Sequence, residues 1–284
     1  LRIFFNKLCN FRKGAATLIF ISDGDGRPEI KRRAKVVNRE VWWAAQAIEL
    51  IGNFRFYHYQ APGEAEAELA QLNYHGLIDG VVTSDSDSLV FSSQLSIPKM
   101  SQTTYDDEMV LYTLDSIHRS LSLTLGGLLL FALLSGGDYS NGIYGCGRVV
   151  ALGLARCGFG DQLLEAIEKD EDPAIFSPRL RGLICTELRE NPQGKLDTRH
   201  PSLAAQFPDD FPNPEVVKLY HKPVTSWSYN QKLPSQGNWK TREPSIAKIT
   251  QFCYDNLGWR TESVLKEKLH SHLWEGVFAQ MLFS

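Results

Sequence analysis

The sequence of 284 residues has few cysteines, no C-x-x-C pair and no apolar run long enough to cross a bilayer. An odd count of five cysteines argues against a disulfide framework and favours reduced thiols in an intracellular protein. The most apolar run, from Leu121 to Leu134, is shorter than the roughly 20 residues that a membrane helix needs and contains Gly126 and Gly127. It predicts a buried helix. No signal-peptide pattern is present, and we expect no membrane partner.

The sequence also lacks an excess of positive charge, since its net charge is −3. No global field therefore indicates a nucleic-acid partner, although a clustered stripe of basic residues is enough for phosphate contacts. Such a cluster is present at Lys31, Arg32, Arg33, Lys35 and Arg39. The ordinary explanation of a charge run is a solvated face, so the cluster alone does not establish DNA binding.

Strand and helix patterns alternate through the first half of the chain. Strands are expected at 17–21, 54–59, 80–83 and 95–99, and helices at about 32–51, 62–74, 114–121, 125–134 and 148–156. This alternation predicts an α/β fold, with a mostly parallel central sheet flanked by helices. From about Pro173 onward prolines cluster, and only 245–257 and 262–272 are expected to be helical.

Acidic residues are expected beyond the carboxyl ends of these strands, or just after the apolar helix, where sites form in open α/β sheets. They are Asp23, Glu64, Glu66, Asp85, Asp87 and Asp138. A single Asp after a strand is more often a turn or a helix cap, so the combination carries the prediction. Six carboxylates in one cleft would repel unless cations lay between them. Hard cations such as Mg²⁺ fit, and two of them would clamp a phosphodiester.

The spacing of Glu64 and Glu66 needs explanation, because two residues apart on a regular helix point about 200° apart. They converge only if Glu64 lies at an irregular first turn, which Pro62 and Gly63 permit. Glu68 would share a face with Glu64 on a regular helix, and we expect it on the surface.

Three segments resemble the internal signature of the XPG and flap endonuclease family: APGEAEA at 61–67, TSDSDSLVF at 83–91 and LLSGGDY at 133–139. Their order and separations match over most of Leu1 to Glu165. The resemblance implies a PIN-like nuclease core that uses two Mg²⁺ ions, with Mn²⁺ as a substitute. It assigns three carboxylates to each ion: Asp23, Glu64 and Glu66, then Asp85, Asp87 and Asp138.

Two further segments resemble parts of the same family. PEIK at 28–31 resembles the segment that carries a catalytic lysine, here Lys31, which would neutralise charge on the phosphate. Arg39 is the candidate for a second catalytic cation, and Lys35 competes with it. The extra acid Asp25, beside Asp23, departs from the family pattern.

The segment GIYGCGRVVA at 142–151 resembles the helix-two-turn-helix of this family. Its glycines would let the backbone approach a DNA phosphate, and in relatives its carbonyls hold a monovalent cation, so K⁺ is expected here. The alternative is an ordinary helix–helix connection. Together with the basic stretch, the resemblance places DNA contacts at Lys31, Arg32, Arg33, Lys35, Gly145, Gly147 and Arg148.

The resemblance divides the chain into a nuclease core at 1–137, a helix-two-turn-helix region at 138–172 and a C-terminal extension at 173–284 that becomes helical. Only 41 residues separate Asp23 from Glu64. Flap endonucleases use a longer stretch there to build a threading arch, so the shorter one favours a Holliday-junction resolvase. LDTRHP at 196–201 and FPNPE at 211–215 also resemble fungal-type resolvases. The expected partner is branched or flapped double-stranded DNA in the nucleus, with two copies on four-way junctions.

Three alternatives stay open. One is a 5′ flap endonuclease. A second is a phosphatase of the haloacid-dehalogenase type, suggested by Asp23-Gly-Asp25, although the following Gly26 does not fit that motif and the later acids stay unexplained. The third is a non-catalytic DNA-binding chain, because helical apolar spacing starts at Leu1 and the sequence is expected to begin inside a domain. The family's N-terminal strand, with a further metal-binding aspartate, has no match before Asp23.

Overall fold

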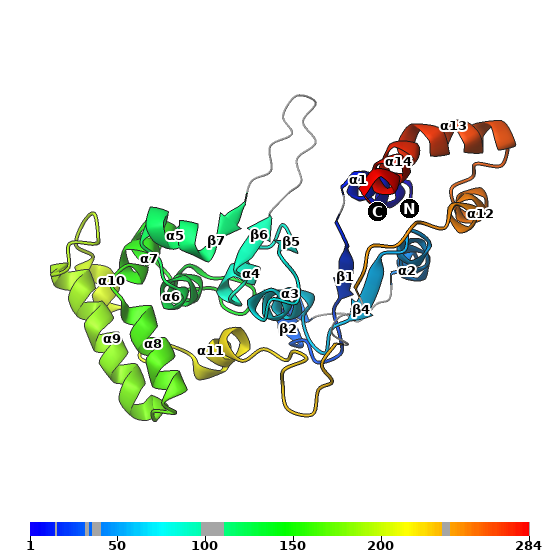
Figure 1. The fold of residues 1–284 in the computed structure, drawn as a ribbon. Helices are drawn as coiled ribbons and strands as arrows, with labels where there is room; N and C mark the ends of the chain where they lie inside the picture. Colours follow the sequence, from blue (N-terminus) through cyan, green and yellow to red (C-terminus); the bar gives the residue numbers. More distant parts are fainter. Residues whose placement is uncertain (15, 32–33, 36–40, 98–110, 235–238, 284) are drawn as a thin grey trace. The chain divides into compact units, whose positions relative to one another are not determined.

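The computed structural model describes the chain except for residues 15, 32–33, 36–40, 98–110, 235–238 and 284 (Figure 1). Contacts divide the chain into two units, and each is described by itself. The first consists of Leu1–Asp23, Val37–Ala61 and Lys232–Ser284, and the second of Gly24–Val36 and Pro62–Gln231.

The first unit is a helical cluster around one pair of parallel strands. Its elements are α1 (Arg2–Lys13), β1 (Ile19–Ser22), α2 (Ala44–Asn53), β4 (Tyr57–Gln60), α12 (Ile246–Asn256), α13 (Glu262–His272) and α14 (Trp274–Phe283). In the parallel pair, Ile19 lies opposite Tyr57 and Ser22 opposite Gln60. Aromatic and aliphatic side chains, including Phe5 of α1 and Phe252 of α12, form the core of this unit. Segments from both ends of the chain therefore build one unit.

In its described residues, the second unit contains five short strands and most of the helices. Its strands are β2 (Ile30–Lys31), β3 (Ala34–Lys35), β5 (Val81–Val82), β6 (Leu95–Ile97) and β7 (Tyr112–Thr113). Its helices are α3 (Ala65–Tyr74), α4 (Asp87–Val90), α5 (Leu114–Leu121), α6 (Leu125–Ser135), α7 (Arg148–Ala155), α8 (Phe159–Glu168), α9 (Pro173–Glu190), α10 (Pro201–Ala205) and α11 (Pro214–His221). Strands β2 and β3 pair antiparallel, while β6 pairs parallel with β5 and antiparallel with β7.

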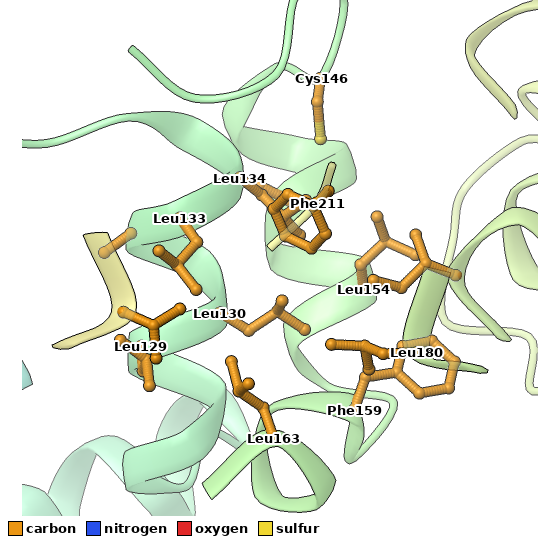
Figure 2. Close-up of a cluster of buried hydrophobic side chains, with 14 of the residues drawn as sticks. Leu129, Leu130, Leu133, Leu134, Cys146, Leu154, Phe159, Leu163, Leu180 and Phe211 are labelled. Carbon is orange, nitrogen blue, oxygen red and sulfur yellow. The ribbon is translucent and has the colours of Figure 1, made fainter. Parts of the chain in front are cut away.

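Helix α6 is the centre of the second unit. Leu129, Leu130, Leu133 and Leu134 are buried, and the helix packs against α7 and α8. Figure 2 shows Leu130 and Leu134 facing Leu154, Leu163 and Phe211. This confirms a buried helix over the apolar run from Leu125 onward, whereas Leu121 is the exposed last residue of α5. Among the residues described, no single helix is long and apolar enough to cross a membrane. The pair α5 and α6, bent by 73°, meets that test by length and composition alone.

The α/β fold class predicted from the sequence is confirmed, with a difference in the sheet. The described strands form three small sheets instead of one central sheet. The expected helix at 32–51 is wrong at its start: α2 begins at Ala44, and Ala34–Lys35 is a strand paired with Ile30–Lys31. The rest of 32–40 lies outside the described residues. Division of the chain at 137 and 172 stays a prediction.

The proline-rich half of the chain holds helices that the sequence pattern did not predict. Prolines lie in the first turn of α9, α10 and α11. At that position proline is well tolerated, because its missing N–H would have no partner inside the helix. Asp172 and Asn213 cap two of these helices by accepting backbone N–H groups. These prolines therefore start helices.

Two glycines set how closely α6 and α8 approach each other. A Cβ at Gly160 would lie 1.9 Å from the carbonyl oxygen of Gly126, and one at Gly126 would lie 2.5 Å from the amide nitrogen of Asp161. By contrast, a Cβ at Gly182 on α9 would meet nothing within 4 Å. Only the glycines of the α6–α8 crossing are required by packing.

Gly160→Ala should therefore lower the free energy of unfolding by about 1–3 kcal/mol, because the two helices must move apart. The matched control Gly182→Ala should raise it by about 0.5–1 kcal/mol, because alanine reduces the entropy of the unfolded chain. Urea denaturation of the two variants and the parent measures both. Equal effects of the two changes would contradict the packing of α6 on α8 described above.

Candidate active site

Glu64 is held at the start of α3, outside the regular helix. It is the N-cap residue, with an extended backbone (φ −81°, ψ 139°), and its side chain is buried with only 3% exposed. Glu66 lies in the first turn and is half-buried. The irregular start that the sequence required for Glu64 is therefore present.

Asp138 lies in the turn that follows α6. Gly136 ends the helix with φ +89°, a conformation that favours glycine, and the amide of Gly137 donates to the carbonyl of Ser140 at 2.8 Å. Asp138 is 8% exposed. The hydroxyl of Tyr220 lies 2.4 Å from where a Cβ of Gly137 would be, so no side chain fits there. Glycine is therefore required at Gly136 by its backbone angle and at Gly137 by the neighbouring Tyr220 hydroxyl.

Lys31 joins the two buried carboxylates. Its ammonium forms an ion pair with Glu64 and another with Asp138, where Nζ and Oδ2 are 3.2 Å apart. Nζ also lies 5.8 Å from the ring centre of Tyr139, whose hydroxyl donates to Glu64. Burial alone would lower the pKa of Lys31, but the hydrogen bonds and charges of Glu64 and Asp138 outweigh it and raise this pKa. Lys31 is thus a protonated cation at neutral pH.

Asp85 and Asp87 lie just after β5 in a hydrogen-bonded turn. The amide of Asp85 donates to Oγ1 of Thr83, and the amide of Asp87 donates to Oδ1 of Asp85, both at 3.0 Å. Asp87 is the first residue of α4, and its charge helps to raise the pKa of Tyr220, for which burial is the main cause. Asp138 and Glu64 act on the same hydroxyl. The charges of Asp87, Asp138 and Glu64 therefore all act on one tyrosine.

The other predicted site residues either lie in the first unit or are described only in part. Asp23 follows β1 in the first unit, where it is exposed and its backbone carbonyl accepts a hydrogen bond from Gln60. Lys35 lies in β3. Arg32, Arg33 and Arg39 lie outside the described residues. The structure thus brings together Lys31, Glu64 and Asp138, and it describes Asp23 only within its own unit.

The predicted hairpin joins α6 to α7 and is largely exposed. Gly145 has φ +81°, which favours glycine, and Leu203 lies 3.6 Å from where its Cβ would be. Gly147 caps α7 with an ordinary backbone (φ −67°, ψ 167°), and a Cβ there would meet nothing within 4 Å. Arg148, the first residue of α7, is exposed. The fold thus accounts for a glycine at 145 but requires none at 147.

The expectation that Glu68 of α3 lies on the surface is wrong, and the sequence analysis did not identify two tyrosines of the site, Tyr139 and Tyr220. Glu68 is fully buried instead of exposed, and its Oε2 accepts the backbone N–H of Ser226 at 2.9 Å. A segment from the proline-rich half covers this face of α3, which helical spacing alone did not indicate. Tyr139 follows Asp138 directly in its motif, whereas Tyr220 lies far along the chain with no local signal.

The donor chemistry of the site fits Mg²⁺. Its carboxylates supply hard oxygen ligands, and two of them are buried around one ammonium. Within the part of the chain that the structure describes, no three or more His, Cys, Asp or Glu side chains are grouped closely enough to enclose a metal ion. Mg²⁺ usually keeps several waters and uses one or two carboxylates together with substrate phosphate. A hydrated ion of that kind suits the acids present.

Comparison with known proteins identifies the site region. A family model described as the XPG I-region matches residues 55–138, which include Glu64, Asp85, Asp87 and Asp138. The chain is 36% identical over 136 residues to Flap endonuclease GEN homolog 1 of Mus musculus, which is 47% of this chain and 15% of that protein. It is 33% identical over 214 residues to DNA repair protein RAD2 of Saccharomyces cerevisiae, which is 75% of this chain and 19% of that protein.

Solved structures agree with these relatives. The Holliday junction-resolving enzyme GEN1, in complex with product DNA and Mg²⁺, superposes with a TM-score of 0.74 at 30% identity. The match covers 98% of this chain and 65% of that one. The chain thus spans less than a fifth of the two curated relatives and under two thirds of the solved enzyme. With the motif order, the local geometry and these matches in agreement, the chain belongs to the XPG/flap endonuclease superfamily.

Proposed function

We propose that this chain is the core of a metal-dependent, structure-specific DNA endonuclease that acts on branched DNA in repair or recombination. The observation that carries the proposal is the bridge of Lys31 between the buried carboxylates of Glu64 and Asp138. An ion pair that served stability alone would gain little from this burial, because desolvation of the charges offsets their attraction. In a phosphodiesterase, the same charges would meet a phosphate and its metal ions.

The metal ligands proposed for this chain are the six predicted acids: Asp23, Glu64, Glu66, Asp85, Asp87 and Asp138. Two bound Mg²⁺ ions, or Mn²⁺ in their place, would supply an activated water and stabilise the leaving oxygen. The chain's own groups do the positioning. Tyr139 orients Glu64 through its hydroxyl, and the protonated Lys31 offers N–H donors to a phosphate oxygen. Arg39 is the second catalytic cation in this proposal, with Lys35 as its competitor.

DNA binding is proposed at two places. The hairpin would accept the phosphate backbone at Gly145, Gly147 and Arg148, with K⁺ held by its carbonyls. The exposed start of α7 supports this, because the N–H groups of a helix N-terminus attract phosphate. The basic stretch of Lys31, Arg32, Arg33 and Lys35 would contribute further contacts. Nuclear localisation follows from such a role.

A resolvase-like activity is favoured over a 5′ flap endonuclease. The solved GEN1 chain matched above is a Holliday junction-resolving enzyme, and 98% of this chain superposes on it. The flap reading stays the second candidate, because the mouse relative carries the name flap endonuclease. Two copies of the chain would act on one four-way junction.

Asp87→Asn should lower the cleavage rate with Mg²⁺ by at least about 100-fold, because a lost ligand misplaces the metal. DNA affinity measured in Ca²⁺ should stay close to that of the parent, since phosphate contacts elsewhere supply most of the binding. Asp79→Asn, at an exposed aspartate near β5, is the control and should cut at the parental rate. Parental cleavage by the Asp87 variant would remove this residue from the metal site.

Gly147→Val should leave thermal stability unchanged, because the backbone suits any residue and the Cβ has open space. It should weaken binding of duplex DNA about tenfold by blocking close approach of a phosphate. Arg148→Ala should reduce the magnitude of the slope of log affinity against log salt concentration by about one, because one phosphate contact is lost. Fluorescence anisotropy across salt concentrations measures both, with Gly182→Ala as the control. Folded variants that bind as tightly as the parent would contradict the hairpin assignment.

The short stretch between Asp23 and Glu64 leads to a test of resolvase against flap endonuclease. A flap with a bulky group on its 5′ end should still be cut, because this stretch is too short for a closed arch. Junction cleavage should rise more steeply than linearly with protein concentration, since resolution needs two nicks, while flap cleavage should rise linearly. Strict dependence on a free 5′ end, with intact junctions uncut, would favour the flap endonuclease.

A further inference from the structure

Tyr220 is a buried tyrosine of α11 whose hydroxyl lies at the turn that carries Asp138. Its side chain is 2% exposed, and its ring packs against Phe91 and Tyr139, with ring centres 5.9 Å and 4.7 Å away. The hydroxyl lies within 2.4 Å of the Cβ position of Gly137, the residue before Asp138. The aromatic ring is thus accommodated by packing, while the polar end is directed at the turn that carries a predicted ligand.

The phenolic proton of Tyr220 has no acceptor among the described residues, although its oxygen lies beside the backbone amide of Asp138. Burial raises the pKa of this hydroxyl, and the charges of Asp87, Asp138 and Glu64 raise it further. The O–H of a tyrosine is a hydrogen-bond donor, so a buried one requires an acceptor. A buried donor without an acceptor destabilises a fold, whereas phenylalanine would make the same ring contacts without that cost.

We propose that Tyr220 is a positioning residue for the metal-loaded site: its hydroxyl donates a hydrogen bond to the metal's ligand shell on the side of Asp87 and Asp138. The acceptor is a carboxylate oxygen of these residues or a water bound beside them. This inference rests on the proposed function, because it needs a divalent cation at the site. Such outer contacts hold ligands in place and typically change metal affinity by about 10- to 100-fold.

Replacement of Tyr139 and of Tyr220 by phenylalanine should have different effects on the stability of the metal-free protein. The hydroxyl of Tyr139 already donates to Glu64, so Tyr139→Phe removes a hydrogen bond present without metal. In Tyr220→Phe, the lost hydroxyl had no acceptor, so the variant should be as stable as the parent or more stable. Tyr74→Phe removes an exposed hydroxyl from α3 and is the neutral control.

The test measures Mn²⁺ binding by electron paramagnetic resonance and Tm with and without Mn²⁺, on the full chain. Tyr220→Phe should weaken Mn²⁺ binding by about tenfold. It should also reduce the rise in Tm that Mn²⁺ causes, while its metal-free Tm equals or exceeds that of the parent. Tyr139→Phe should have a lower metal-free Tm, and Tyr74→Phe should match the parent in every measurement.

A purely structural hydroxyl at Tyr220 would give the reverse: a lower metal-free Tm and Mn²⁺ affinity equal to that of the parent. That outcome overturns the inference and leaves the proposed nuclease function intact, because the parent still binds metal. A parent that binds no Mn²⁺ would overturn both the metal-dependent function and the role of Tyr220. Mn²⁺ binding by the parent therefore distinguishes failure of the proposed function from failure of the role of Tyr220.

Discussion

The bridge of Lys31 between Glu64 and Asp138 is the constraint on which the site of the second unit depends. Burying a carboxylate without a cation costs several kcal/mol, and here two are buried side by side. The three residues come from β2, from the extended residue before α3 and from the turn after α6. Each element must therefore end at the right place, and the Pro-Gly pair before Glu64 and the Gly-Gly pair before Asp138 lie at these ends.

The hydrophobic core fixes the position of Asp138 indirectly. Helix α6 packs against α7 and α8, and the Gly-Gly-Asp segment of the site follows its last turn. The glycine-on-glycine crossing with α8 leaves α6 little freedom to slide or rotate. A change at Gly160, far from the carboxylates in sequence, would therefore displace the end of α6 and with it Asp138.

How far the sequence predicted this structure depended on whether the determining contacts were local. The bounds of α5 and most of α6 were predicted, α6 because it lies in the most apolar run, and the irregular start of α3 followed from Pro62 and Gly63. Glu68 was misplaced because the segment that buries it, around Ser226, lies far along the chain. Tyr220 was missed for the same reason. Helices α9 to α11 were not predicted, because this proline-rich half shows little helical periodicity, although proline is well suited to a first turn.

Two features of the second unit have no explanation within the fold itself, and both lie where the family resemblance expects an outside partner. Gly147 has ordinary dihedral angles and open space around it, so neither backbone nor packing selects glycine. The proton of Tyr220 has no acceptor among the described residues, although a phenylalanine would pack as well. Because Gly147 has no side chain, although one would fit, its backbone stays accessible to a DNA phosphate. A buried donor at the turn that carries Asp138 likewise suits a ligand shell that forms only when metal binds.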